Sequence, residues 1–157
     1  FNLIGTVSNN EKKELALKYG AKKIINYKEE NFIEKVLEIT NNDGVVAAYD
    51  GIGSDSPRDS IKCLSTFGTL CTFGAASGPS TLTIDDLPAS IKYTKGSIAT
   101  LIKDKEKLNE SASDFLSLLE NGNLEIQIGQ IYDLKDAAKA HSDLENRKTT
   151  GSIILKP

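Results

Sequence analysis

Short apolar runs alternate with amphipathic segments through the first half of the chain. The runs predict buried strands, because they are short and are bounded by turn-forming residues. The segments between them place apolar residues at helical spacing, as Phe32, Val36 and Leu37 do. The expected strands are Leu3–Val7, Ile24–Tyr27, Val45–Tyr49 and Phe67–Phe73. One expected helix ends near Tyr19, and two others cover Glu30–Thr40 and Ser56–Leu64.

This alternation predicts the class of fold. Strands separated by single helices of this length form parallel sheets, because a parallel connection needs a crossover segment. Successive apolar positions, as in Val45–Tyr49, are typical of strands that helices cover on both faces. We therefore expect an α/β fold with a Rossmann-like, doubly wound parallel sheet.

The pattern continues after Phe73 with longer connections. A loop of small residues, Gly74–Ser80, precedes a strand that is expected to open at Gly96–Ile98. Asp104–Asn121 is the clearest amphipathic helix of the chain, with acids in its first turn and Gly122 after its end. The remaining expected elements are a strand at Ile126–Ile128, a helix at Asp133–Glu145 and a strand at Ser152–Leu155.

Composition and charge narrow the classes of function. The net charge of −3 over 157 residues offers no basic field to a nucleic-acid backbone, so no nucleic-acid partner is expected. No apolar run approaches the ~20 residues that span a bilayer, so no membrane association is expected. The two cysteines are too few for a disulfide framework, which indicates free thiols in a reducing, cytoplasmic compartment. Because the chain has no Met, we expect it to be part of a longer protein.

A glycine-containing turn follows the third expected strand. Ligands of open α/β sheets bind at the carboxyl ends of the strands, so this turn is a candidate site. Gly51–Ser56 resembles the dinucleotide motif G-x-G-x-x-G, but Ser56 stands in place of the third glycine and no acid follows the next strand. We therefore interpret it as a tight strand-to-helix turn that uses the conformational freedom of glycine.

The residues after the first expected strand indicate which cofactor the fold would take. An NAD enzyme usually has an acid here for the ribose 2′-hydroxyl, whereas this chain has Ser8 and, four residues later, Lys12. A hydroxyl and an ammonium group suit the 2′-phosphate of NADP. The alternative is an ordinary helix start with solvated lysines.

Other candidate residues have equally open alternatives. Tyr27, at a strand end, can stack on adenine or cover the sheet. The loop Gly74–Gly78 can let a ligand approach its backbone or can simply be flexible. Arg147 can be a solvated charge at a helix end. His141 lies in a helix without a partner motif and is interpreted as structural.

Several short motifs, in order and at matching spacing, resemble the quinone oxidoreductases of the medium-chain dehydrogenase/reductase superfamily, the zeta-crystallin-like group. Each motif is modest by itself, but together they extend over nearly the whole chain. They are Ile4–Ser8, Gly20-Ala21, Ile25–Glu30, Val46–Asp50 with Gly53, Cys63-Leu64, Phe73–Gly78, Lys95–Ser97, Ala140-His141, Leu144-Glu145 and Arg147–Gly151.

The resemblance implies an enzyme that transfers a hydride from NADPH to a quinone, a small-molecule substrate, without a metal. Ser8 and Lys12 then correspond to 2′-phosphate ligands and Tyr27 to the adenine-side contact. The loop Gly74–Ser77 corresponds to the segment beside the nicotinamide. No side chain of the family is clearly an acid–base catalyst, so catalytic residues stay unassigned. The full set of implied cofactor contacts is Ser8, Lys12, Tyr27, Ile52, Phe73, Gly74, Ala75, Ala76, Ser77 and Arg147.

The chain departs from the family pattern in three places. The N-terminal catalytic barrel and the first β-loop-α unit, with its pyrophosphate-binding glycines, are missing, so the sheet is expected to be incomplete. Ala75 stands where family members usually have Asn. The stretch Ser97–Lys107 is several residues shorter than in the family, where it continues a sheet-edge strand that supports dimerisation. A homodimer through the edge near Ser97 is the assembly that the resemblance implies.

The resemblance also implies a division of the chain. Residues 1–128 correspond to a partial dinucleotide-binding domain, and residues 129–157 to a segment that returns to the catalytic domain. We expect the 157 residues alone to be inactive and to bind NADPH weakly, because the helix N-terminus for the pyrophosphate is missing. The alternatives are a non-enzymatic nucleotide-binding or crystallin-like structural module, and a relative of the zinc alcohol dehydrogenases.

Overall fold

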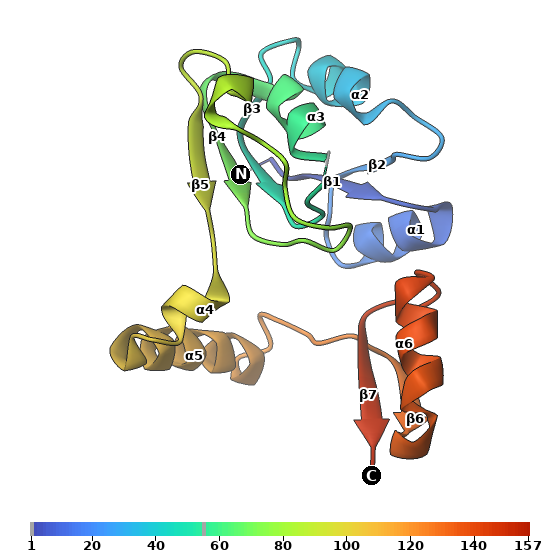
Figure 1. The fold of residues 1–157 in the computed structure, drawn as a ribbon. Helices are drawn as coiled ribbons and strands as arrows, with labels where there is room; N and C mark the ends of the chain where they lie inside the picture. The colour runs from blue at the N-terminus through green and yellow to red at the C-terminus, as the bar shows by residue number, and fades with distance from the viewer. Residues whose placement is uncertain (1, 55) are drawn as a thin grey trace. The chain divides into compact units, whose positions relative to one another are not determined.

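The computed structural model describes residues 2–54 and 56–157 in two compact units, Phe1–Ile98 and Ala99–Pro157 (Figure 1). Asp55, inside the glycine turn, lies outside the described residues.

The first unit has the predicted alternation of strands and helices. Every strand pair in its described part is parallel, in two sheets of order β1-β2 and β3-β4-β5. This confirms the α/β class with parallel sheets. The elements are β1 (Ile4–Val7), α1 (Asn10–Lys18), β2 (Lys23–Asn26), α2 (Phe32–Ile39), β3 (Val45–Asp50), α3 (Ser56–Lys62), β4 (Leu64–Thr72), the 3₁₀ turn η1 (Ile84–Asp86) and β5 (Lys92–Lys95).

Asparagine side chains start the first two helices. The Asn9 side chain accepts a hydrogen bond from the Lys12 amide at 2.8 Å, and Asn31 accepts one from the Ile33 amide at 3.1 Å. Each bond satisfies an amide that has no partner within its helix. Gly20, with φ of +91°, follows the end of α1 in the left-handed conformation, as expected for a residue just past a helix.

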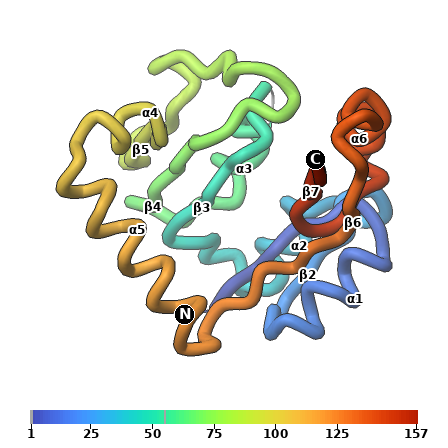
Figure 2. The backbone as a smooth tube through the Cα atoms, turned by 90° about the horizontal axis from the view of Figure 1, so that it is seen from below, coloured from blue at the N-terminus to red at the C-terminus, as the bar shows by residue number. Residues whose placement is uncertain are grey.

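One apolar cluster joins the two sheets of the first unit. Its buried members are Ile25 of β2, Val36 of α2 and Cys63 at the end of α3. Half-buried residues from both sheets pack against them, including Ile4 of β1 and Val45 of β3. α2 and α3 lie next to each other (Figures 1 and 2). The core of the unit therefore lies under α2 and α3.

β3 departs from the expectation that both faces of the sheet are covered. Val46 is 75% exposed and Tyr49 is 76% exposed, although both lie in an apolar run. An apolar run predicts a strand, but its periodicity does not show whether another segment covers each face of that strand. The central strand β4 is more deeply placed, and its Leu70 has no exposed surface.

The prediction of a strand that opens at Gly96–Ile98 is wrong. The structure has β5 at Lys92–Lys95, followed by a short helix, α4, over Ile98–Leu101. All four residues of β5 are exposed. A strand at the end of a sheet with no buried face has no apolar alternation, so pattern reasoning cannot detect it.

The second unit contains most of α4, then the longer helix α5 and a β-α-β unit. β6 and β7 pair in parallel, from Ile128 opposite Ser152 to Asp133 opposite Lys156. The predicted strand at Ile126–Ile128 starts later, and the predicted helix at Asp133–Glu145 is divided into a 3₁₀ turn and α6. The elements are α5 (Lys105–Glu120), β6 (Ile128–Asp133), η2 (Leu134–Asp136), α6 (Ala137–Glu145) and β7 (Ser152–Lys156).

Candidate cofactor site

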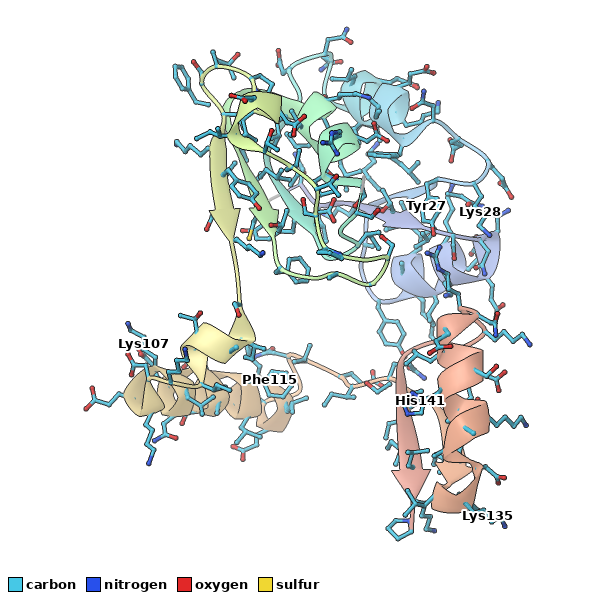
Figure 3. All side chains as sticks on the ribbon, in the orientation of Figure 1. Tyr27, Lys28, Lys107, Phe115, Lys135 and His141 are labelled. Carbon is cyan, nitrogen blue, oxygen red and sulfur yellow. The ribbon has the colours of Figure 1, made fainter. Side chains whose placement is uncertain are left out.

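The ends of β1 and β2 meet through the backbone. The Tyr27 amide donates a hydrogen bond to the Val7 carbonyl oxygen at 3.0 Å. Val7 is the last residue of β1, and Tyr27 directly follows β2. The bond therefore places Ser8, the next residue after Val7, beside Tyr27. The Tyr27 side chain is 38% exposed, with Lys28 next to it (Figure 3).

Lys12 lies in the first turn of α1, just after this strand end. Its own amide is held by the Asn9 cap at 2.8 Å, and the residue is half-buried, as Ser8 is. Amide groups and the positive end of the helix dipole favour an anion here. The structure thus brings Ser8, Lys12 and Tyr27 to the joined ends of β1 and β2.

A buried asparagine network supports the same strand end. Asn26 is 1% exposed, and its side-chain amide donates to the Asn10 side-chain oxygen at 3.1 Å. The amide of Asn10 in turn donates to the Glu29 carboxylate at 3.0 Å, and Lys13 lies 3.7 Å from the Glu30 carboxylate. These contacts bind both acids to α1. Sequence reasoning missed this network.

The turn after β3 is organised by the carboxylate of Asp50, which is 5% exposed. One oxygen accepts from the amides of Ile52 and Gly53 at 2.9 and 3.1 Å. Both oxygens lie 2.9 Å from the Ser56 hydroxyl, and the second also accepts from Ser60 at 3.0 Å. This explains the glycine turn without a dinucleotide motif. Sequence reasoning placed Asp50 at a strand end but assigned it no role; the signal for that role was an acid directly before G-x-G with serines six and ten residues later.

The loop after β4 is hydrogen-bonded to this turn. Ser77 donates to the Ile52 carbonyl oxygen from its amide at 2.8 Å and from its hydroxyl at 3.0 Å. The Ser54 amide donates to the Gly78 carbonyl oxygen at 2.9 Å, and the Phe73 amide to the Asp50 carbonyl oxygen at 3.0 Å. The predicted residues Ile52 and Phe73–Ser77 therefore form one surface.

Two glycines allow this close approach. A Cβ atom added to Gly74 would overlap the Gly51 carbonyl oxygen, and one added to Gly53 would overlap the Gly78 carbonyl oxygen. The loop is thus fixed by hydrogen bonds at its far end and by close backbone contact at its start. Ala75 and Ala76, between them, are exposed.

The segment beyond this loop is fixed to α3 by Arg58. Its guanidinium group donates to the Thr81 hydroxyl at 2.7 Å and lies 3.1 Å from the Asp86 carboxylate. Hydrogen bonds from Thr83, first from its amide and then from its hydroxyl, lower the pKa of Asp86. The carboxylate therefore stays ionised as a partner for Arg58.

Cys63 is a packing residue with a free thiol. It is 4% exposed and belongs to the apolar cluster. Burial, with a smaller contribution from the charge of Asp59, raises the pKa of its thiol to about 11. The thiol is therefore protonated at neutral pH and is not poised as a nucleophile.

Arg147 belongs to the second unit. It follows α6 in the left-handed conformation, with φ of +59°, and its amide donates to the Leu144 carbonyl oxygen at 3.0 Å. His141 is exposed on α6 (Figure 3). The structure brings nine predicted residues into two groups of the first unit: Ser8 with Lys12 and Tyr27, and Ile52 with Phe73–Ser77. Arg147 lies in the other unit, so its contact with a cofactor stays a prediction.

Neither a metal cluster nor a membrane-crossing helix occurs in the part of the chain that the structure describes. Within residues 2–54 and 56–157, no three His, Cys, Asp or Glu side chains are grouped to hold an ion. None of the helices in those ranges has the length and apolar character needed to cross a bilayer.

The chain is similar in sequence to proteins of known activity. It is 39% identical to quinone oxidoreductase of Pseudomonas aeruginosa and 39% identical to quinone oxidoreductase 1 of Escherichia coli, each time over 99% of this chain and 49% of the relative. It is 34% identical to 2-haloacrylate reductase of a Burkholderia species, over 99% of the chain. The chain thus spans about half the length of the curated relatives it matches.

Solved structures have the same fold. The quinone oxidoreductase of Escherichia coli complexed with NADPH matches with a TM-score of 0.91 and 37% identity, over 99% of this chain and 49% of that one. The quinone oxidoreductase of Pseudomonas syringae matches with the same TM-score, identity and shares. The parallel sheets of this chain therefore have the Rossmann-like arrangement of the matching half of these quinone oxidoreductases.

A family model described as zinc-binding dehydrogenase matches residues 19–155. Because this match covers most of the chain, and because the relatives above cover all but a few of its residues, the chain belongs to the zinc-binding dehydrogenase family and is similar throughout to its quinone oxidoreductases, members of the medium-chain dehydrogenase/reductase superfamily.

Proposed function

We propose that this chain is the NADPH-binding portion of a zinc-independent, cytoplasmic quinone oxidoreductase, which transfers a hydride from NADPH to a quinone or a related enone. The observation that carries the proposal is the meeting of Ser8, Lys12 and Tyr27 at the joined ends of β1 and β2. The relatives that the chain resembles support the type of reaction.

The residues at this strand end suit the adenosine half of NADPH. The Ser8 hydroxyl and the Lys12 ammonium group would hold the 2′-phosphate, and the exposed ring of Tyr27 would lie against adenine. The acids nearby, Glu29 and Glu30, have partners on α1. Their contacts with α1 reduce the repulsion that a free carboxylate would exert on a phosphate.

The surface formed by Ile52 and Phe73–Ser77 suits the nicotinamide half. Bound NADPH would supply the hydride, and the protein would hold and orient the ring. Ala75 offers no side-chain amide, so polar contacts in this loop would come from its backbone and from Ser77. We propose that Arg147 contacts the phosphate end and that residues 129–157 return to a catalytic domain.

The test is steady-state oxidation of NADPH by the complete gene product, with a simple benzoquinone as acceptor. We expect turnover with NADPH and a preference over NADH of about 10-fold or more in kcat/KM, since a single well-placed charge contact contributes roughly 1.5–3 kcal/mol. NADPH binding without turnover would instead support a non-enzymatic nucleotide-binding module. Absence of both would contradict the proposal.

We also propose that two copies associate through β5, next to Ser97. β5 ends the order β3-β4-β5, so within the described residues its outer side has no strand partner. Antiparallel pairing centred between Tyr93 and Thr94 would place Lys92 opposite Lys95 of the second copy. Salt screens this repulsion, so sedimentation velocity should show more dimer at high ionic strength than at low. A monomer in all salt conditions would contradict this assembly.

A further inference from the structure

Asp50 is a buried carboxylate whose hydrogen-bond donors are neutral. They are the amides of Ile52 and Gly53 and the hydroxyls of Ser56 and Ser60, at 2.9–3.1 Å. A buried charge is costly unless such bonds compensate it, and here they come from three successive parts of the chain: the turn after β3, the first turn of α3 and its middle. The geometry therefore serves to hold the turn in one conformation.

Ile52 links the turn after β3 to the loop after β4 by hydrogen bonds. Its amide donates to the Asp50 carboxylate, and its carbonyl oxygen accepts two hydrogen bonds from Ser77. The peptide groups on both sides of Ile52 are thus fixed. The Asp50 backbone adds a direct bond to the start of the loop, through the Phe73 amide at 3.0 Å.

We propose that Asp50 is a positioning residue for hydride transfer, acting through Ile52 and Ser77 on the surface that receives the nicotinamide. This inference rests on the proposed function, because it needs the nicotinamide to lie at that surface. Asp50 itself is 5% exposed and lies beneath the turn, so it would act without touching the cofactor. The shape of the turn and loop would orient the ring, so the loss of Asp50 should lower the rate of transfer.

The test uses the complete gene product with Asp50→Ala and Asp50→Asn. Ala removes the acceptor of all four donors. Asn keeps one side-chain oxygen, which can still accept from the two amides, but it has no second oxygen for both serine hydroxyls. We expect single-turnover hydride transfer to fall about 100-fold in Asp50→Ala and about 10-fold in Asp50→Asn, since small misplacement of a reacting group costs about that much. Asp59→Ala and Asp59→Asn, on the exposed side of α3, are matched controls and should keep the wild-type rate.

A second readout separates positioning from general loss of structure. Adenosine 2′,5′-bisphosphate carries only the adenosine end of NADPH, so it would bind at the ends of β1 and β2. We expect its Kd to stay within about twofold of the wild-type value in both Asp50 variants, because their energetic effects are local. A variant that unfolds would lose this binding together with the hydride transfer.

The possible results are distinct. Slow transfer with intact binding of the bisphosphate supports the positioning role. Wild-type transfer rates in both variants would overturn it while leaving the proposed function intact. If Asp50→Ala does not fold, Asp50→Asn decides alone, and a wild-type rate in that variant overturns the proposal. Failure of the wild-type protein to bind NADPH or to reduce quinone would instead overturn the proposed function.

Discussion

Replacing Gly53 by Ala should lower the free energy of unfolding by about 2–5 kcal/mol, from backbone strain of roughly 1–2 kcal/mol and overpacking of roughly 1–3 kcal/mol. Gly53 has φ of +79°, which disfavours any residue with a Cβ atom. The added methyl group would overlap the Gly78 carbonyl oxygen and lie 3.0 Å from the Ala75 Cα. Both neighbours are backbone atoms, so the loop after β4 must move. NADPH affinity should fall together with stability.

Gly20→Ala is the matched control for this change. Gly20 also has a positive φ, +91°, and belongs to the same unit, but no other described atom would lie within 4 Å of an added Cβ. Urea unfolding of the two variants separates the effects, since only backbone strain of about 1–2 kcal/mol applies to Gly20. Equal destabilisation of the two variants would contradict the crowding described for Gly53.

Changing Lys12 to Glu should weaken NADPH binding by about 100-fold, or ~2.7 kcal/mol, and leave NADH binding nearly unchanged. The change replaces an attractive charge beside the 2′-phosphate by a repulsive one, and NADH has no phosphate there. The fold of α1 should not suffer, because an acid in the first turn of a helix interacts favourably with its dipole. Fluorescence titration of the complete gene product with each nucleotide gives both dissociation constants.

Lys18→Glu makes the same change of charge in the last turn of α1, at the opposite end from Ser8. It should leave the ratio of NADPH to NADH affinity within about twofold of wild type, because solvent and salt screen a charge at that distance. Equal losses for both nucleotides in Lys12→Glu would remove Lys12 from the phosphate site. The two variants together separate a local contact from the overall charge of the protein.

Elements with a strong apolar signal could be predicted closely from the sequence. β3 was expected at Val45–Tyr49 and occupies Val45–Asp50, and the long helix expected at Asp104–Asn121 occupies Lys105–Glu120. β5 could not be predicted, because Lys-Tyr-Thr-Lys has no buried face to impose alternation. β4 was expected to begin at Phe67 but begins at Leu64. Leu64 pairs with Val45 and Thr69 pairs with Ala47, and the chain bulges between these two residues of β4.

The two groups of candidate site residues were predictable for a topological reason. Parallel strands end on the same side of their sheet, so residues that follow neighbouring strands, such as Ser8 and Tyr27, come together without any signal in their own identity. The role of Asp50 was missed because it depends on hydrogen bonds to residues up to ten positions later. Spacing alone does not show that a carboxylate is buried and that these donors converge on it.

Each sheet of this protein is made from strands that follow one another along the chain. Paired residues are therefore only 19 to 24 positions apart, from Ile4 opposite Lys23 to Ile128 opposite Ser152. Short separations lower the entropy lost on closing each connection. During synthesis, β1 can thus pair with β2 as soon as both have left the ribosome, before β3 has emerged. The order of translation then matches the order in which the sheets can form.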